Sequence, residues 1–207
     1  MEWLIGVDEA GRGALAGPVS VGAVLYPSDF DWQELYALVT PRGEVRLRDS
    51  KQLSAQQREL LFERIVSHGR LKHAAAFVDA ETIDQIGIVN ACHEAAAAAI
   101  RALGIGPERV FVQLDAGLRA PSEWNQGAFV RGDATYPAIA FASVIAKVSR
   151  DRLMEELADE YPGYGFEGHK GYGTAAHASA IHKHGMSVLH RQTFCSGILT
   201  SIRAGVV

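Results

Sequence analysis

The sequence predicts a single α/β domain on three observations. Short apolar, β-branched runs alternate with segments of helical spacing along the 207 residues. Hydrophobic residues make up 48% of the chain, which is enough for one core. Three of the apolar runs are each followed by an aspartate, and strand ends on one edge of an open α/β sheet share a crevice. We therefore expect one sheet flanked by helices, with an acidic site at its edge.

The composition excludes several classes of protein. The longest apolar stretches, such as 137–146, fall well short of the ~20 residues that span a bilayer, and no apolar leader precedes the first strand. We expect a soluble, cytoplasmic protein with no membrane partner. Cys92 and Cys195 are too few for a disulfide framework and lack the spacing of a zinc site, which predicts two buried thiols. The net charge of −4 argues weakly against a polyanionic partner, but residues 162–194 contain a single acid among many basic residues, so one end can be positive.

The first apolar run, 3–7, predicts a buried strand that ends at Asp8 and Glu9. Two carboxylates at the end of a core strand are costly unless a cation meets them, and a divalent metal is the usual cation. The alternative is that both acids simply end the strand in solvent. Because successive strand residues point to opposite faces, both side chains reach one site only if the chain bends at Glu9 to Gly11.

A glycine-rich link leads to the second strand. Arg12 stands between Gly11 and Gly13, and its planar five-donor fork suits phosphate or sugar oxygens. The apolar run at 19–25 predicts the second strand, and the tight link indicates an antiparallel pair. Residues 28–39 have a roughly helical spacing and are expected to be peripheral.

A capping motif predicts where the next helix begins. Ser54 and Gln57 have the form of a capping box, which predicts a helix reaching about His68. Lys51 lies in the loop before this helix, where it could act on a ligand, although composition alone favours a solvated lysine.

A third strand is expected at 73–78 and one long helix at 82–103, whose alanine run at 95–99 forms a thin face for the core. The strand at 109–114 ends at Asp115, and the short strand at 128–130 runs into Asp133. These two aspartates can converge with Asp8, and such convergence of like charges is unfavourable without cations, which makes it a metal hypothesis.

The last third of the chain is expected to be helical. A long helix is predicted at 137–161, with Lys147 and Arg150 either near the crevice or on the surface, and the surface is favoured for Arg150. A glycine-rich loop around Tyr172 separates it from two final helices, at 174–184 and from about 190 to 202.

Carboxylates without clustered histidines or cysteines suit Mg²⁺ or Mn²⁺ and disfavour zinc. Such sites commonly hold two ions ~3.5–4 Å apart for phosphodiester hydrolysis. The five histidines between 169 and 190 are interpreted as surface residues. Tyr172 could stack on a sugar or base, or be a buried structural tyrosine.

Together these segments resemble bacterial ribonuclease HII, in the family's order from residue 5 to about residue 194. The type III relatives differ in carrying a lysine where Arg12 stands. The matching segments are DEAGRG at 8–13, LAGPV at 15–19, DSKQLS at 49–54, RGD at 131–133, ASVIAKV at 142–148, RDR at 150–152 and HKGY at 169–172.

The resemblance implies a ribonuclease H-like fold, with a mixed five-stranded sheet flanked by helices. It implies one catalytic domain over residues 1–207, with about 162–207 as a C-terminal helical, substrate-binding extension, and a monomer. It also implies cleavage of the RNA strand in RNA–DNA hybrids, and nicking on the 5′ side of ribonucleotides embedded in duplex DNA. Cleavage would leave a 3′-hydroxyl end and a 5′-phosphate end. The activity would serve to remove ribonucleotides from DNA and to remove RNA primers.

The family's site residues carry over position by position. Its catalytic, metal-binding carboxylates fall on Asp8, Glu9, Asp115 and Asp133. Its reader of the 2′-hydroxyl, the one group that marks a ribonucleotide in DNA, falls on Gly11, Arg12 and Gly13. Its junction-stacking tyrosine falls on Tyr172. Lys51 and Lys170, which stand in two of the matching motifs, are expected to contact substrate.

The chain departs from the family at a few positions, none of them a carboxylate. Ala116 and Arg131 replace a glycine and a lysine, residues 141–143 replace a more alanine-rich run, and 195–197 replace a proline-containing segment. One rival is another two-metal nuclease on the same fold, which would not need a 2′-hydroxyl reader. The other is a non-catalytic hybrid-binding module, which would bind phosphates better without four carboxylates.

Overall fold

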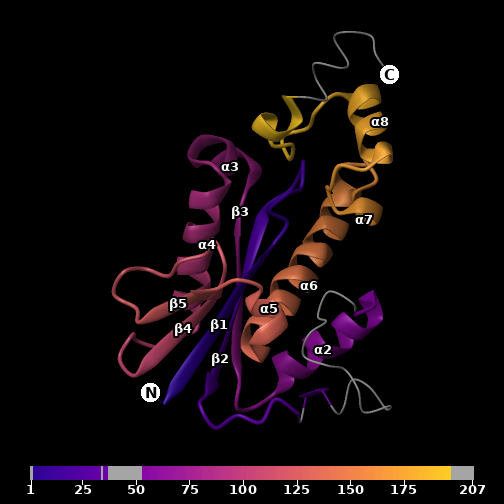
Figure 1. The fold of residues 1–207 in the computed structure, drawn as a ribbon. Helices are drawn as coiled ribbons and strands as arrows, with labels where there is room; N and C mark the ends of the chain where they lie inside the picture. The colour runs from indigo at the N-terminus through magenta and orange to yellow at the C-terminus, as the bar shows by residue number, and fades with distance from the viewer. Residues whose placement is uncertain (1, 34, 37–52, 197–207) are drawn as a thin grey trace.

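A mixed five-stranded sheet forms the centre of the molecule, in the order β3-β2-β1-β4-β5 (Figure 1). The computed structural model describes residues 2–33, 35–36 and 53–196. The strands are β1 (Trp3–Ala10), β2 (Val19–Pro27), β3 (Lys72–Val78), β4 (Val110–Asp115) and β5 (Gln126–Phe129). The predicted sheet is confirmed, and so is the antiparallel pairing of β1 with β2.

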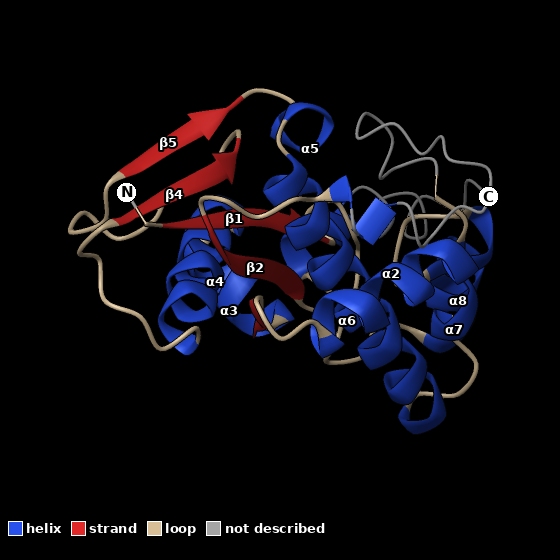
Figure 2. Ribbon diagram, turned by 90° about the horizontal axis from the view of Figure 1, so that it is seen from below, coloured by secondary structure: helices blue, strands red, loops and turns tan. Residues whose placement is uncertain are grey.

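The parallel part of the sheet sets the position of the acids. β1 pairs with β4 in a register that places Val7 beside Leu114, and β4 pairs with β5 so that Asp115 lies beside Phe129. In Figure 2 the arrowheads of β4 and β5 point the same way, and α5 (Gly132–Thr135) lies just beyond them. Because parallel strands end at one edge, Asp8 and Asp115 fall at neighbouring positions there.

Helices cover both faces of the sheet and bury one core on each (Figure 1). On one face lie α6 (Pro137–Glu160) and α2 (Ala55–Ser67); on the other lie α3 (Ala80–Ile86) and α4 (Ile88–Ala102). The long helix predicted at 137–161 is confirmed as α6. In the described ranges, no helix is both long enough and apolar enough to cross a membrane.

The start of α2 follows from its capping box. Ser54 Oγ accepts the Gln57 N–H at 3.2 Å, and Gln57 Oε1 accepts the Ser54 N–H at 2.8 Å. These bonds satisfy two backbone donors that the first helical turn leaves open. The predicted cap and helix are therefore confirmed.

The single helix predicted at 82–103 is wrong, because the chain breaks at Gly87 into α3 and α4. Gly87 has φ 80° and ψ 151°, a conformation open to glycine but strained for other residues. Helical spacing continues through the break, so periodicity alone did not reveal it. The alanine face lies in the core as expected, with Ala91, Ala95 and Ala99 buried against the sheet.

The C-terminal part packs back onto the link after β1. It contains α7 (Phe166–His169) and α8 (Ala175–His184), which confirms the first of the two final helices. The second is helical over 192–196, and the remainder of its predicted range lies outside the described residues. The Gly17 N–H donates to the Leu189 carbonyl at 2.8 Å. Whether this segment forms a separate substrate-binding extension stays a prediction.

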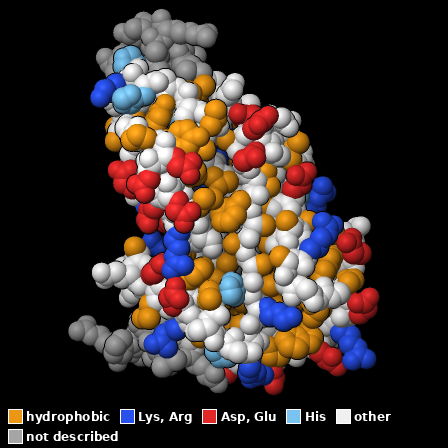
Figure 3. Space-filling model, turned by 180° about the vertical axis from the view of Figure 1, so that it is seen from behind, with side chains coloured by type: hydrophobic (Ala, Val, Ile, Leu, Met, Phe, Trp, Pro, Cys, Tyr) orange, Lys and Arg blue, Asp and Glu red, His pale blue; other side chains and the backbone are white. Residues whose placement is uncertain are grey.

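The expected positive end is flanked by acids from α6. In Figure 3 acidic side chains gather just below the histidines at the upper end of the molecule. A cleft of about 440 Å³ beside α7 is lined in part by Glu155, Asp159 and Glu167. The segment 162–194 is poor in acids, but the fold supplies them from the last turns of the preceding helix.

A glycine in β2 allows the close approach of α6 to the sheet. A methyl group at Gly22 would overlap the Ala142 carbonyl oxygen and come within 2.7 Å of Ala146 N, both backbone atoms of α6. We expect Gly22→Ala to lower the free energy of unfolding by ~1–3 kcal/mol, as overpacking does. Gly69→Ala, at a position with open space around the added methyl, should change it little. Equal denaturant midpoints for the two variants would contradict this packing.

Candidate active site

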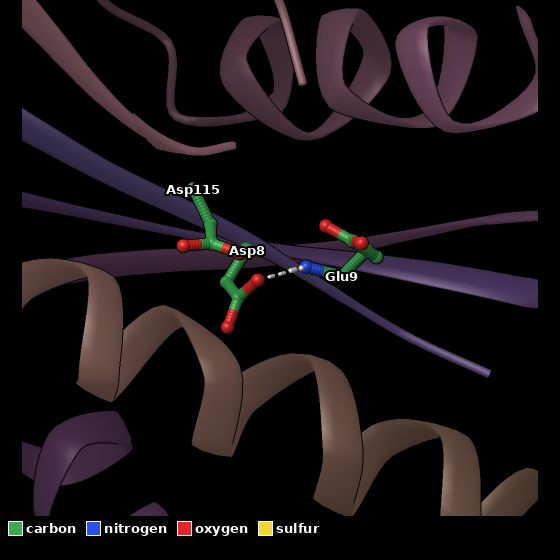
Figure 4. Close-up of side chains that lie close together, drawn as sticks. All are labelled: Asp8, Glu9 and Asp115. Carbon is green, nitrogen blue, oxygen red and sulfur yellow. Dashed lines mark hydrogen bonds between the residues drawn. The ribbon is translucent and has the colours of Figure 1, made fainter. Parts of the chain in front are cut away.

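Three carboxylates meet where β1 and β4 lie side by side. Asp8, Glu9 and Asp115 each offer an oxygen, and these oxygens lie within 4.8 Å of one another. Figure 4 shows the side chains converging from the two strands, with the Glu9 N–H donating to Asp8 Oδ1 at 2.8 Å. We call Asp8, Glu9 and Asp115 the carboxylate triad. The predicted convergence of Asp8 with Asp115 is observed.

The expected bend at Glu9 to Gly11 is found at Gly11, the last of these residues, and it does not interrupt β1. β1 runs through both acids to Ala10, and the ladder with β2 continues to the pair Ala10 and Ser20. The parallel ladder with β4 reaches only Val7, so both acids lie beyond its last pair, next to Asp115. The chain turns at Gly11, where φ is +83°. Grouping of the acids thus follows from the end of β4, with no break in β1.

Burial and the neighbouring carboxylates disfavour the charged forms of Asp8 and Glu9. The pKa of Asp8 lies well above its usual value, first because burial removes the carboxyl from water and then because Glu9 and Asp115 repel its charge. The pKa of Glu9 is also raised, chiefly by burial, while the nearby Arg12 opposes the rise. Glu9 Oε2 is buried and has no hydrogen-bond partner within the described part of the chain. These are the properties of oxygens that a cation can hold.

Arg12 joins the carboxylate triad to the glycine link. Its Nη1 lies 3.3 Å from Glu9 Oε1, and the Arg12 side chain is 39% exposed. A Cβ at Gly117, just after β4, would come within 2.9 Å of that same nitrogen. Gly117, which follows Ala116, therefore leaves room for the Arg12 guanidinium. The Arg12 guanidinium contacts Glu9 on one side and faces solvent on the other. Its remaining N–H groups can therefore donate to a ligand bound next to the acids.

Asp133 adjoins the carboxylate triad without belonging to it. It lies in α5 and is 4% exposed. The preceding Gly132 donates its N–H to Asp115 Oδ1 at 2.8 Å, which ties α5 to the end of β4. The predicted fourth acid is thus close to the edge that carries the others, but its carboxylate lies outside their 4.8 Å grouping.

Two adjoining clefts lie near the acids, and Glu9 lines the smaller one. The first, of about 410 Å³, is lined by Glu9, the link at 10–13 and Tyr172, among others. The second, of about 640 Å³, lies between α2 and α6 and also contains Tyr172. Arg58 of α2 and Lys147 of α6 line both clefts. The site therefore joins an acid, half-buried cationic side chains and an aromatic ring in adjoining clefts.

Arg58 was not among the predicted site residues. The capping box nevertheless fixes where α2 begins, and therefore which of its residues face inward. That starting point could have placed Arg58 on the inner face of α2. Lys147 was left open between the crevice and the surface, and it lies in the crevice, with its Nζ 5.5 Å from the centroid of the Tyr172 ring.

The expected surface position of Arg150 is wrong, since its side chain is fully buried. Its guanidinium donates to the carbonyls of Ala16, Pro18 and Lys170 at 3.0, 2.8 and 2.8 Å. Burial lowers its pKa, but the three carbonyl dipoles favour the charged form. Through these hydrogen bonds, Arg150 connects the link after β1 to the segment that precedes Tyr172.

A second buried arginine, Arg191, also donates hydrogen bonds to backbone carbonyls of this link. Arg191 Nε and Nη2 donate to the Gly17 carbonyl at 3.0 and 2.9 Å, and its Nη1 donates to the Arg12 carbonyl at 3.0 Å. The position of Arg12 thus depends directly on a residue near the end of the described chain.

The prediction that the five histidines lie on the surface is wrong for His177 and His190. His177 and His190 are buried, because aromatic rings and backbone groups of the C-terminal segment enclose them. Both cysteines are buried free thiols, as expected.

The two lysines proposed from motifs have different outcomes. Lys51 lies outside the described residues. Lys170 lines the larger cleft, and its Nζ is paired with Glu155 at 2.8 Å, which partly satisfies its charge within the protein. Its contact with substrate stays a prediction.

Comparison with known proteins agrees with this geometry. The family model for ribonuclease HII matches residues 5–196. A ribonuclease HII of Pelodictyon phaeoclathratiforme is 46% identical over 91% of this chain and 87% of its own. That of Endomicrobium trichonymphae is 43% identical over 91% of this chain and 83% of its own.

A solved structure has the same fold. The crystal structure of the ribonuclease H2 from Pyrococcus horikoshii OT3 superposes with a TM-score of 0.73 at 26% identity, covering 97% of this chain and 99% of that one. The fold is therefore the ribonuclease H-like α/β fold that the resemblance implied. By the extent of the family match and the identity to its members, this chain belongs to the ribonuclease HII family.

Proposed function

We propose that this protein is a divalent-metal-dependent endoribonuclease acting on ribonucleotides paired with DNA. It hydrolyses the RNA strand of RNA–DNA hybrids and nicks duplex DNA on the 5′ side of an embedded ribonucleotide, leaving a 3′-hydroxyl and a 5′-phosphate. The observation that carries the proposal is the presence of Glu9, Arg12 and Tyr172 in one cleft. Such an activity would serve the removal of ribonucleotides from DNA and of RNA primers.

The carboxylate triad fits Mg²⁺ or Mn²⁺. It supplies only oxygen donors, which hard divalent cations prefer, and it includes the unpartnered Glu9 Oε2. When bound, such ions would activate an attacking water and stabilise the leaving oxygen of a phosphodiester. We propose Asp133 as a fourth ligand, on the ground that α5 is held to Asp115 through Gly132.

The remaining residues would bind and orient the nucleic acid. Arg12, with Gly11 and Gly13 leaving the backbone uncluttered, would donate to the 2′-hydroxyl, the group that distinguishes a ribonucleotide from its neighbours. Tyr172 would stack at the junction between RNA and DNA. Arg58 and Lys147 line both clefts and would contact phosphates on either side of that junction.

The test is cleavage of a labelled DNA duplex that contains one ribonucleotide, with Mg²⁺, with Mn²⁺ and with chelator. We expect metal-dependent nicking immediately 5′ of the ribonucleotide. Asp8→Asn should lower this rate by ~10²-fold or more, since the site loses one charged oxygen while the Asn carbonyl can still accept the Glu9 N–H.

Asp159→Asn, at an exposed position in the last turn of α6, is the matched control and should cleave normally. Cleavage of long hybrids alone would leave the metal site standing but remove the junction assignment. No cleavage of either substrate would favour a binding module, and near-normal turnover by Asp8→Asn would refute the metal assignment.

The raised pKa of Asp8 predicts competition between protons and metal. Below that pKa the carboxyl is protonated and cannot serve as a ligand, so activity should fall as the pH is lowered through it. Because metal binding favours the deprotonated form, a higher Mg²⁺ concentration should move the acid limb of the pH–rate profile to lower pH. Profiles measured at two Mg²⁺ concentrations check this, and an acid limb that stays in place would argue against it.

A further inference from the structure

Three histidines surround the backbone of Tyr172, outside the carboxylate triad. His169 ends α7, His177 lies in α8, and His190 comes shortly after α8. The side chains of His177 and His190 are 0% and 3% exposed, and the rings of His169 and His177 stack with centroids 4.3 Å apart. Because buried imidazole nitrogens are costly without hydrogen bonds, the partner of each nitrogen is informative.

The partners assign the protons on two of these rings. The Tyr172 carbonyl can only accept, so His177 Nδ1, 3.0 Å away, must donate to it. In the neutral ring His177 Nε2 is then an acceptor, and His190 Nε2, at 3.1 Å, must donate to it. That leaves His190 Nδ1 as an acceptor, and it lies 2.9 Å from the Ser187 N–H. One chain of hydrogen bonds, with one direction, therefore runs from Ser187 to the Tyr172 carbonyl.

The third histidine holds the residue before Tyr172. His169 Nδ1 accepts the Gly171 N–H at 3.2 Å, and its Nε2 lies 2.8 Å from the Tyr164 carbonyl, to which it donates. The Gly171 carbonyl in turn accepts the Leu15 N–H at 2.8 Å. Two imidazoles thus fix two consecutive residues against the link that carries Arg12.

The hydrogen-bond chain needs neutral rings. Burial lowers the pKa of His177 to about 4 and also lowers that of His190, so both are uncharged at neutral pH. Two cations lie near the Tyr172 ring, with Arg150 Cζ 5.4 Å and Lys147 Nζ 5.5 Å from its centroid. The protein therefore fixes the backbone of this tyrosine from one direction and its ring from another.

We propose that His177 and His190 are positioning residues that set the placement of Tyr172 for single ribonucleotides in duplex DNA, without touching the substrate themselves. The proposal rests on the function proposed above, in which Tyr172 stacks at the RNA–DNA junction. A long hybrid makes many contacts along the clefts, so it should depend less on this one ring than a single ribonucleotide does.

The test compares two variants of similar size. His177→Leu removes the side-chain donor to the Tyr172 carbonyl and leaves the Thr174 N–H as its partner, whereas His177→Asn keeps an N–H near the place of Nδ1. We expect His177→Leu to lower kcat/KM on the single-ribonucleotide duplex by about tenfold relative to long hybrid, and His177→Asn to restore it to within about twofold. Mg²⁺-induced stabilisation should be the same in both, since the carboxylate triad is unchanged.

A double variant separates positioning from general damage to the fold. Adding His177→Leu to Tyr172→Ala should cause little further loss, because the ring to be positioned is already absent. Independent losses that multiply in the double variant would overturn the proposal. An Asn variant as impaired as the Leu variant would do the same, and in either case the proposed nuclease activity would stand.

The protons can also be observed without any activity. In ¹⁵N NMR of the histidine rings we expect Nδ1–H for His177 and Nε2–H for His190, and a shifted amide of Gly173, which shares a peptide unit with the Tyr172 carbonyl, in His177→Leu. Nε2–H on His177 would overturn the proposal. If the wild-type protein failed to cut at the ribonucleotide, the proposed function would fail, and this spectrum would still decide whether the histidines hold Tyr172.

Discussion

The crowding of three carboxylates at the ends of two parallel strands is the constraint on which the site depends. Parallel pairing places Asp115 beside Asp8, and the extra length of β1 adds Glu9. Each charge there loses water and faces its neighbours, which is unfavourable until a cation arrives. Arg12 relieves part of this by pairing with Glu9, and in doing so it is held over the acids, where a ligand would lie. The acids thus fix the position of Arg12, for which we propose a role in substrate binding.

The second requirement is to hold separate segments over those acids, and buried arginines meet it. Arg150 and Arg191 bond to backbone carbonyls of the link after β1, and Arg150 also bonds to Lys170. A carboxylate partner for either guanidinium would have added negative charge near an already crowded site. Carbonyl dipoles stabilise the cations without that cost, and they fix the backbone itself. The link and the Tyr172 segment consequently form one surface facing the clefts.

Sequence patterns predicted the features that depend on local chemistry. The strands, the capping box of α2 and the meeting of Asp8 with Asp115 follow from periodicity, side-chain caps and strand ends. Patterns failed where partners lie far apart in the chain: Arg150 looked like a surface cation because its carbonyls are about 20 and 130 residues away. His177 looked exposed for another reason: its partners Tyr172 and His190 are close in sequence, but the turns that enclose its ring leave no periodic signal. Strand ends also indicated Glu9 and Asp133 as acids of the site, whereas the role of Arg12 as a reader of the 2′-hydroxyl came from the resemblance, because spacing alone does not assign a ligand to it.

The unfolding free energy of the metal-free protein tests the central constraint most directly. Denaturant unfolding of wild type and Asp8→Asn would be measured above the raised pKa of Asp8, first with chelator and then with Mg²⁺. If the carboxylate triad is crowded and awaiting a cation, the Asn variant is more stable than wild type in chelator, and Mg²⁺ stabilises wild type far more than the variant. An Asn variant that is less stable without metal, and equally stabilised by Mg²⁺, would contradict the account.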